Sequence, residues 1–348
     1  MVNVALVGLG HWGPNLARNF VALPEATLHT LCDAQTERLE RLGRQYPGAK
    51  QQTAFEAVLA DSTVDAVVIA TPVQTHFELA LAALQAGKHV LVEKPLAQTV
   101  QQCQTLIDAA AAQKAVLMAG HVFLYNAAVR KVKEYIESGE LGEIFYIYSQ
   151  RLNLGIIRQD VNALWNFAPH DLSIINYWLD GAPESVTARG YSYLQPDIED
   201  VVFMTLDYPG GIGANIHISW LDPNKVRRMT VVGSRKMVVY DDVSPDAKVV
   251  VYDRGVTKKP NNPSLGRYES FGEFQLLLRA GDILIPKVEF VEPLRLECRH
   301  FIECIQTGIK PLSDGYDGLR VVQVLEAAQQ SLNKRTELAV KIETKDIS

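Results

Sequence analysis

Two hydrophobic patterns alternate in the first third of the chain: short runs of consecutive apolar residues, and longer segments with an apolar residue every third or fourth position. The run at 90–92 leaves no polar face for water, which is typical of a central strand in a parallel sheet. The mostly apolar runs at 2–7 and 64–69 are also predicted to be strands of this sheet. Further strands are predicted at 27–32, 49–51 and 116–119, and helices from Pro14, over 36–46, from 54, and over 75–86 and 100–113. This alternation predicts a doubly wound parallel α/β sheet in residues 1–120.

After residue 120 the apolar stretches become rich in β-branched and aromatic residues, which favour strands. Turns such as Pro209-Gly210-Gly211 separate several of them at hairpin-like spacing. Strands are predicted at 143–152, 185–193, 201–208, 213–220, 227–233, 236–240 and 338–342, helices at 127–137, 293–306 and 318–331, and a loop or arm at 254–280. Residues 121–348 are therefore predicted to form an α+β domain with a mostly antiparallel, open-faced sheet.

A glycine-rich turn, Gly8-Leu9-Gly10-His11-Trp12-Gly13, joins the first predicted strand to the first predicted helix. Gly8 permits a tight turn, Gly10 lets the backbone approach a pyrophosphate, and Gly13 lets helix and strand pack closely. The position between a strand and a helix predicts a Rossmann domain that binds a dinucleotide, and we include His11 and Trp12 among the cofactor contacts.

Asp33 ends the second predicted strand, about twenty residues after Gly13, where a carboxylate bonds both ribose hydroxyls of a dinucleotide. Its charge would repel a 2′-phosphate, so the predicted cofactor is NAD, and NADP is disfavoured. Arg38 lies nearby, weakens this preference, and is included among the cofactor contacts.

The motif Ala70-Thr71-Pro72 follows the strand at 64–69, at the sheet edge where open α/β sheets bind ligands. Thr71 in this position either meets the cofactor or caps a turn. We include Thr71, Pro72 and His76 in the predicted cofactor site.

The motif Glu93-Lys94-Pro95 ends the strand at 90–92 at the same edge of the sheet. Pro95 stops the strand because it has no N–H to donate to a neighbouring strand. Partial burial is expected to lower the pKa of Lys94 enough for proton exchange near neutrality. Lys94 is therefore predicted to be catalytic, and Glu93 and Lys94 also complete the predicted cofactor site.

The glycine-rich turn, Ala70-Thr71-Pro72 and Glu93-Lys94-Pro95 together resemble the motifs of the glucose–fructose oxidoreductase/inositol dehydrogenase (Gfo/Idh/MocA) family. The resemblance implies an NAD-dependent enzyme that acts on a small sugar. It also implies a homodimer or homotetramer that associates through the open sheet of the second domain.

The segment from Trp165 to Asp171 is the expected chemical centre of the second half. Pro169 is predicted to open a helix, which places His170 in its first turn, where the helix dipole disfavours a protonated imidazole. A neutral imidazole suits a general base. The resemblance implies a catalytic histidine here with an acid four residues earlier, but Asn166 occupies that position and cannot accept a proton. Lys94 and His170 remain as the predicted catalytic pair.

Arginines and amides of the second half are the candidates for substrate binding. Guanidinium groups suit phosphate or carboxylate, and of Arg151, Arg158, Arg227 and Arg228 we favour Arg158, because its segment runs directly into Trp165. Most of these arginines are alternatively solvated strand or loop residues. The predicted substrate-binding residues are Tyr125, Asn126, Arg151, Arg158, Asn162, Trp165 and Asn166.

Composition and charge argue against several classes of protein. The chain has 348 residues, 47% hydrophobic and 21% charged, with a net charge of −6 and no block of like charges, which argues against nucleic-acid and membrane partners. The four cysteines are scattered without metal-ligand spacing, so no metal site is predicted, and reduced thiols in a cytoplasmic protein are expected. The early first strand leaves no room for a signal peptide.

The sequence favours an oxidoreductase that oxidises a secondary sugar hydroxyl. Within the family the second half looks most like the sugar-nucleotide 3-dehydrogenases, which implies C3 of a UDP-N-acetylhexosamine or its uronic acid as the oxidised position, in polysaccharide synthesis. The alternatives are an inositol or free-sugar dehydrogenase, a glycosidase that uses bound NAD, and a non-catalytic NAD-binding regulator.

Overall fold

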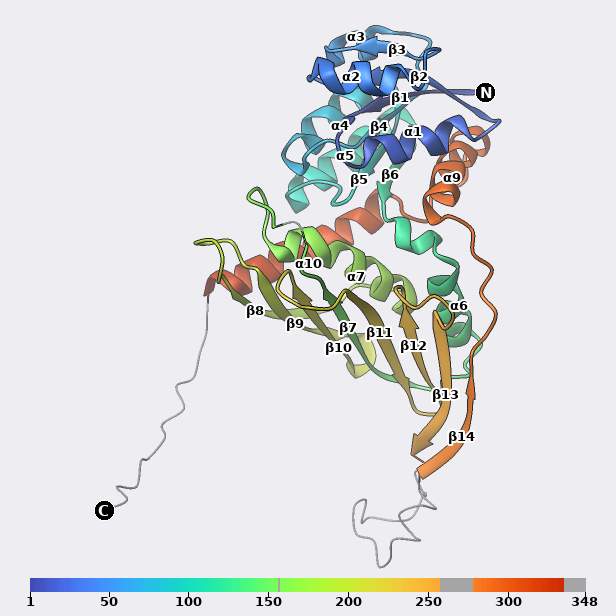
Figure 1. Cartoon of the computed structure of the whole chain (residues 1–348), viewed down its shortest axis with the longest axis vertical. Helices are drawn as coiled ribbons and strands as arrows, with labels where there is room; N and C mark the ends of the chain where they lie inside the picture. The colour runs from blue at the N-terminus through green and yellow to red at the C-terminus, as the bar shows by residue number, and fades with distance from the viewer. Residues whose placement is uncertain (156, 257–277, 335–348) are drawn as a thin grey trace, which may run out of the picture.

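The computed structural model describes residues 1–155, 157–256 and 278–334, which form two layered units stacked along the long axis (Figure 1). The first unit is a parallel sheet with strand order β3-β2-β1-β4-β5-β6, which confirms the predicted doubly wound α/β fold. Its strands are β1 (Val2–Val7), β2 (Ala26–Cys32), β3 (Lys50–Gln52), β4 (Ala66–Ile69), β5 (His89–Glu93) and β6 (Leu117–Gly120). Its helices are α1 (Gly13–Val21), α2 (Thr36–Gly43), α3 (Phe55–Ala60), α4 (His76–Gln85) and α5 (Val100–Gln113).

The second unit is a sheet with strand order β14-β13-β12-β11-β7-β10-β9-β8, in which every pairing except β7 with β10 is antiparallel. Its strands are β7 (Ile144–Leu152), β8 (Ser185–Tyr191), β9 (Val201–Tyr208), β10 (Ile212–Ser219), β11 (Val226–Gly233), β12 (Met237–Asp241), β13 (Val249–Val256) and β14 (Leu278–Leu284). Helices α6 (Ala127–Glu137), α7 (Ala163–Leu179), α9 (Pro293–Thr307) and α10 (Gly315–Lys334) complete the fold.

The interpretation of residues 254–280 as a loop or arm is wrong at both of its ends. Residues 254–256 continue β13, which pairs antiparallel with β14. The run Val249-Val250-Val251-Tyr252 at the start of β13 is strongly β-forming, and the nearby prolines and glycine outweighed that signal. Residues 257–277 and the strand predicted at 338–342 lie outside the described residues.

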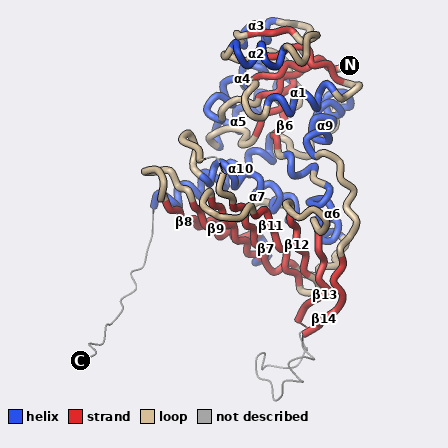
Figure 2. The backbone as a smooth tube through the Cα atoms, in the orientation of Figure 1, coloured by secondary structure: helices blue, strands red, loops and turns tan. Residues whose placement is uncertain are grey.

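One face of the second sheet is covered and the other is open. Helices α6, α7 and α10 lie between this sheet and the first unit (Figures 1 and 2). Strand β9 alternates buried and exposed residues, as a half-covered sheet requires, and Phe203 and His217 stack on the open face with ring centroids 4.3 Å apart. The predicted open-faced sheet is confirmed, whereas association through that face stays a prediction.

The last two helices bind the chain back onto the first unit. Apolar side chains of α9 join the core that contains Leu16 and Phe20 of α1, and Arg18 forms an ion pair with Glu292. Gly318 of α10 packs so closely on the first unit that a Cβ there would come within 2.7 Å of Leu96. The two units therefore share cores and do not merely touch.

All four cysteines are buried and free. Among the described residues, none of the helices combines the length and apolar character needed to cross a membrane.

Candidate active site

The glycine-rich turn is shaped by close backbone contacts. Gly8 has φ of +93°, and a Cβ on it would come 2.6 Å from the backbone of Ala70. A Cβ on Gly13 would come 2.3 Å from the carbonyl oxygen of Gly8, whereas Gly10 faces open space, with Arg38 Nη1 the nearest atom at 3.6 Å. This space belongs to a cavity of about 490 Å³ lined by Gly10, His11, Pro14, Arg38, Arg41, Leu42 and Gln45.

Asp33 directly follows β2 and is tied to the glycine turn. Its Oδ2 accepts a hydrogen bond from the Leu9 N–H (2.7 Å), and its Oδ1 accepts one from the Gln35 N–H (2.8 Å). Arg38 Nη1 lies 3.6 Å from Oδ2. The turn and this carboxylate fit a nicotinamide dinucleotide, because Gly10 leaves room for the pyrophosphate and Asp33 would hold the adenosine ribose.

The loops after β4 and β5 are joined by His76. Its Nδ1 lies 2.8 Å from the carbonyl oxygen of Pro95 and its Nε2 lies 2.9 Å from that of Thr71, and burial lowers the pKa of this imidazole. Thr71 Oγ1 accepts a hydrogen bond from the Thr75 hydroxyl (2.7 Å). These contacts of His76 and Thr71 hold the loop that contains Pro72. Trp12 lies just before α1, is partly buried, and packs against the core that contains Leu16 and Phe20.

Lys94 reaches from the first unit into the second. Its Nζ donates a hydrogen bond to the carbonyl oxygen of Asn166 on α7 (2.9 Å). Burial lowers the pKa of Lys94, and the carboxylate of Glu93 opposes this shift. The positive charges of Arg151, Arg158 and Arg227 add to it. A lysine in this environment can hold or release a proton near neutral pH.

Two carboxyl groups, Glu93 and Glu297, lie close enough to influence each other. Burial raises the pKa of Glu93, with the Lys94 ammonium opposing it, and the side chain of Glu93 packs against Gly120. Glu297 of α9 is fully buried, and no partner for its carboxyl oxygens is found within the described residues. Burial and the charge of Glu93 raise the pKa of Glu297 well above its usual value, which favours the neutral form of this carboxyl.

His170 lies inside α7, and the prediction that Pro169 opens this helix is wrong. Helix α7 begins at Ala163, and the side chain of its N-cap residue Asn162 accepts a hydrogen bond from the Trp165 N–H (3.1 Å). Asn162 is a strong N-cap, and the helix continues through Pro169 because tertiary packing outweighs the lost hydrogen bond. His170 is therefore not in the first turn of a helix, and the helix dipole is not the cause of a neutral imidazole here. Burial and the neighbouring cations, first among them Lys94, lower the pKa of His170 well below its usual value.

Arg151 and Asp171 form a buried ion pair next to His170. Arg151 Nε and Nη2 donate to the two carboxylate oxygens of Asp171 (2.7 and 3.2 Å), and the Ser149 hydroxyl donates to the same carboxylate (2.9 Å). The Arg151 guanidinium also lies over the ring of Phe123, 4.9 Å from its centroid. Phe123 packs edge-on against His170 at 5.0 Å.

Arg158 lies in the loop before α7 and is paired with Asp160. Its Nε and Nη2 donate to the two carboxylate oxygens of Asp160 (2.8 and 2.5 Å), and the side chain is 40% exposed. The loop borders a cavity of about 430 Å³ between the two units, whose lining includes Val73, Gln98, Asp160, Asn162, Trp165 and Glu199. Within it Asn162 Nδ2 donates to Glu199, and Trp165 Nε1 donates to Gln329.

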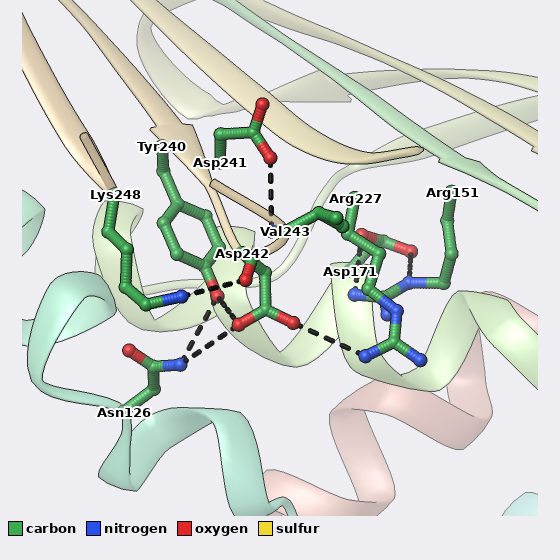
Figure 3. A network of polar contacts seen from close by, with 9 residues as sticks. All are labelled: Asn126, Arg151, Asp171, Arg227, Tyr240, Asp241, Asp242, Val243 and Lys248. Atoms are coloured by element: carbon green, nitrogen blue, oxygen red, sulfur yellow. Dashed lines mark hydrogen bonds and ion pairs between the residues drawn. The ribbon is translucent and has the colours of Figure 1, made fainter. Parts of the chain in front are cut away.

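Tyr125 and Asn126 are held by contacts within the protein. Tyr125 is 1% exposed, and its hydroxyl lies 3.4 Å from Ser313 Oγ. Asn126 caps α6 through its Oδ1, and its Nδ2 lies 3.4 Å from the Tyr240 hydroxyl and 3.3 Å from Asp242 Oδ1 (Figure 3). These polar groups therefore already have partners within the protein. Their role in sugar binding stays a prediction.

The site also contains a His–Asp pair that the sequence patterns did not indicate. His121 directly follows β6, and because Gly120 is the register partner of Glu93, it lies at the level of Lys94 in the sheet. Its Nδ1 is 2.7 Å from Asp317 Oδ2 of α10, and both side chains are buried. Lys94 is a predicted site residue because open α/β sheets bind ligands at the carboxyl ends of their strands. The same reasoning applied to β6 indicates His121.

No group of three or more His, Cys, Asp or Glu side chains arranged to hold a metal ion occurs in residues 1–155, 157–256 and 278–334.

Comparison with known proteins extends this geometry. Residues 2–121 match the model of the oxidoreductase family with an NAD-binding Rossmann fold, and residues 129–239 match that of the GFO/IDH/MocA C-terminal domain. A solved structure of UDP-N-acetylglucosamine 3-dehydrogenase from Acidithiobacillus ferrooxidans superimposes with a TM-score of 0.79 at 24% identity, over 95% of this chain and 97% of that chain. At this identity the likeness concerns the fold alone.

Relatives with different activities show similar levels of identity. The scyllo-inositol 2-dehydrogenase (NAD(+)) of Bacillus subtilis is 24% identical over 99% of this chain and 97% of its own length. The UDP-N-acetylglucosamine 3-dehydrogenase of A. ferrooxidans is 26% identical over 76% of this chain and 81% of its own length. The 2,7-anhydro-N-acetylneuraminate hydratase of Escherichia coli is 28% identical, but the match spans only 61% of this chain and 60% of the hydratase.

Replacing Asp33 with alanine is expected to weaken NAD binding about 10- to 100-fold, because hydrogen bonds from the ribose hydroxyls to a charged acceptor are lost. The same change releases Arg38 from its carboxylate partner, so NADP binding should improve relative to NAD. Titration of both cofactors into the wild type and the variant measures this. Glu37→Ala, an exposed carboxylate in the first turn of α2, is the matched control. Equal affinity of the wild-type protein for NAD and NADP would contradict the prediction.

Proposed function

This chain belongs to the Gfo/Idh/MocA family of oxidoreductases with an NAD-binding Rossmann fold, and from that premise we propose that it is an NAD-dependent dehydrogenase that oxidises a secondary hydroxyl group of a sugar. One observation carries the proposal. Lys94 from the end of β5 and His170 from α7 are brought together, since Lys94 Nζ bonds to the carbonyl of Asn166, one helical turn before His170.

In the proposed reaction the protein positions the alcohol and removes its proton. The bound cofactor supplies the hydride acceptor. Neutral Lys94 accepts the hydroxyl proton directly, or neutral His170 accepts it, because neighbouring charges and burial disfavour the protonated form of both groups.

The finer assignment concerns the sugar. We propose C3 of a UDP-N-acetylhexosamine or of its uronic acid, which the 26% identity to UDP-N-acetylglucosamine 3-dehydrogenase supports. Asn166 in place of an acid also argues against the proton relay expected of the inositol enzymes. An inositol or free-sugar dehydrogenase is the second candidate, because the inositol dehydrogenase of B. subtilis aligns over 99% of this chain. We further propose that the open face of the second sheet carries the contact of a homodimer or homotetramer.

Lys94→Ala and His170→Ala are each expected to retain NAD binding and to lose about 10²- to 10⁴-fold in turnover, the usual contribution of a general acid–base group. NADH formation and NAD titration on the same preparations separate the two effects. Lys50→Ala, an exposed lysine on β3 that is paired with Asp61, is the control and should keep wild-type turnover. Turnover within about threefold of wild type in Lys94→Ala would remove the lysine from the mechanism.

The oxidation rate is expected to rise with pH and to level off well below pH 10.4, the ordinary pKa of lysine, because the neutral amine is the active form and burial lowers its pKa. The charge of Glu93 raises the pKa of Lys94, so Glu93→Gln should move the rising limb of the profile to lower pH. The profile of kcat/KM for both proteins is the measurement. A limb that stays in place or moves to higher pH in Glu93→Gln would show that Lys94 does not control it.

A substrate panel tests the finer assignment. With UDP-hexosamines, their uronic acids, free hexoses and inositols, NADH should form fastest with a nucleotide-linked sugar, because Asn166 leaves the inositol-type relay incomplete. Arg158→Ala should raise KM for that substrate, since a charge-assisted hydrogen bond contributes about 1.5–3 kcal/mol. Faster oxidation of free inositol or glucose than of every nucleotide sugar would reject the assignment. An unchanged KM in Arg158→Ala would leave the substrate class intact and exclude Arg158 from binding it.

A further inference from the structure

Two arginines lie directly opposite each other on the covered face of the second sheet. Arg151 on β7 and Arg227 on β11 are register partners in an antiparallel pair, so their side chains project from the same face. Like charges in this arrangement repel each other unless each has an acidic partner. Asp171 is the partner of Arg151, and Asp242 is the partner of Arg227.

The two ion pairs differ in how many N–H groups of the guanidinium donate hydrogen bonds. Arg151 is 5% exposed and bonds to both carboxylate oxygens of Asp171. Arg227 makes one hydrogen bond, from Nη1 to Asp242 Oδ2 at 3.2 Å, and its side chain is 37% exposed. Figure 3 shows its guanidinium group beside the Arg151–Asp171 pair.

Asp242 does not depend on Arg227 alone. Its Oδ1 accepts hydrogen bonds from the Tyr240 hydroxyl (3.2 Å) and from Asn126 Nδ2 (3.3 Å) (Figure 3). A guanidinium group has five N–H donors, so Arg227 keeps a second edge with which to bind an anion while it stays paired with Asp242.

Arg227 lies close to the groups that handle the proton. Its register partner Arg151 bonds to Asp171, the residue after His170, and Phe123 contacts both Arg151 and His170. After burial, which is the main cause, the positive charge of Arg227 contributes to lowering the pKa of both Lys94 and His170. An anion held by Arg227 would therefore lie in the same site as Lys94 and His170.

We propose that Arg227 is an anion-binding residue of the substrate site, and that the sugar carries a carboxylate or phosphate group that Arg227 binds. This inference rests on the proposed sugar dehydrogenase function. It adds Arg227 to the anion contact predicted at Arg158, which already presents two of its donors to Asp160. A planar guanidinium binds either anion through two parallel hydrogen bonds.

The test measures binding of four ligands to the NAD-loaded protein by calorimetry, together with NADH formation. Glucuronate carries a carboxylate without phosphate, UDP-N-acetylglucosamine carries phosphate without a carboxylate, its uronic acid carries both, and glucose carries neither. Arg227→Gln should weaken binding of the anionic ligand that the site accepts about 10- to 100-fold and leave glucose unchanged. Arg228→Gln is the matched control, because Arg228 is the next residue of β11, projects to the other side of the strand and pairs with Asp241. It should stay within about twofold of wild type.

The ligands distinguish the source of the anion. A loss confined to the two carboxylate ligands identifies a uronate contact, and a loss confined to the two UDP ligands identifies a phosphate contact. Arg227→Lys keeps the charge without the planar fork and should give an intermediate loss. If Arg227→Gln has a lowered melting temperature, the binding measurements on Arg227→Lys decide the test.

Unchanged binding of every anion by the Arg227 variants would overturn the inference, and so would equal losses for glucose and the anions. Failure of the wild-type protein to bind any of the three anions would overturn it as well. Anion binding that depends on Arg227 without NADH formation from any sugar would instead reject the proposed function and leave Arg227 as an anion-binding residue.

Discussion

The buried ion pair between Arg151 and Asp171 fixes the orientation of the helix that carries His170. Burying two charges is costly, and the pair is stable only because its geometry is good and Ser149 supplies a further hydrogen bond. Losing either partner would leave an isolated buried charge, an effect of about 3–5 kcal/mol. A rotation of α7 about its axis would break the pair, so the contact holds His170 on the side of the helix that faces Lys94.

Burial also sets the protonation states at the boundary between the units. The same desolvation lowers the pKa of Lys94 and His170 and raises the pKa of Glu93 and Glu297, because in each case it disfavours the charged form. The arginines on the second sheet add positive potential to this effect. Neither unit alone creates this environment, since Lys94 comes from one and His170 with the arginines from the other.

The sequence was most informative where a side chain follows directly from a strand end. Asp33 and Lys94 could be placed at the carboxyl edge of the first sheet because parallel strands put their ends together. The start of α7 could not be assigned correctly, since Pro169 resembles a helix start and only tertiary packing keeps it inside the helix. Asn126 and Asn162 are predicted sugar ligands, and the structure gives both a further role as helix caps. The difference between Arg151 and Arg227 depends on acidic partners far away in the chain, which no local pattern reveals.

The return of α9 to the first unit has a consequence for synthesis of the protein. The core of the cofactor half includes Phe301 and Ile302, which emerge from the ribosome long after β6 is complete. At a translation rate of about 5–20 residues per second, the earlier part of this core waits about 10–40 s for its last layer. During that interval the apolar face of α1 that α9 later covers remains open to water or to a chaperone. The nucleotide-binding half, although encoded first, is thus completed among the last parts of the chain.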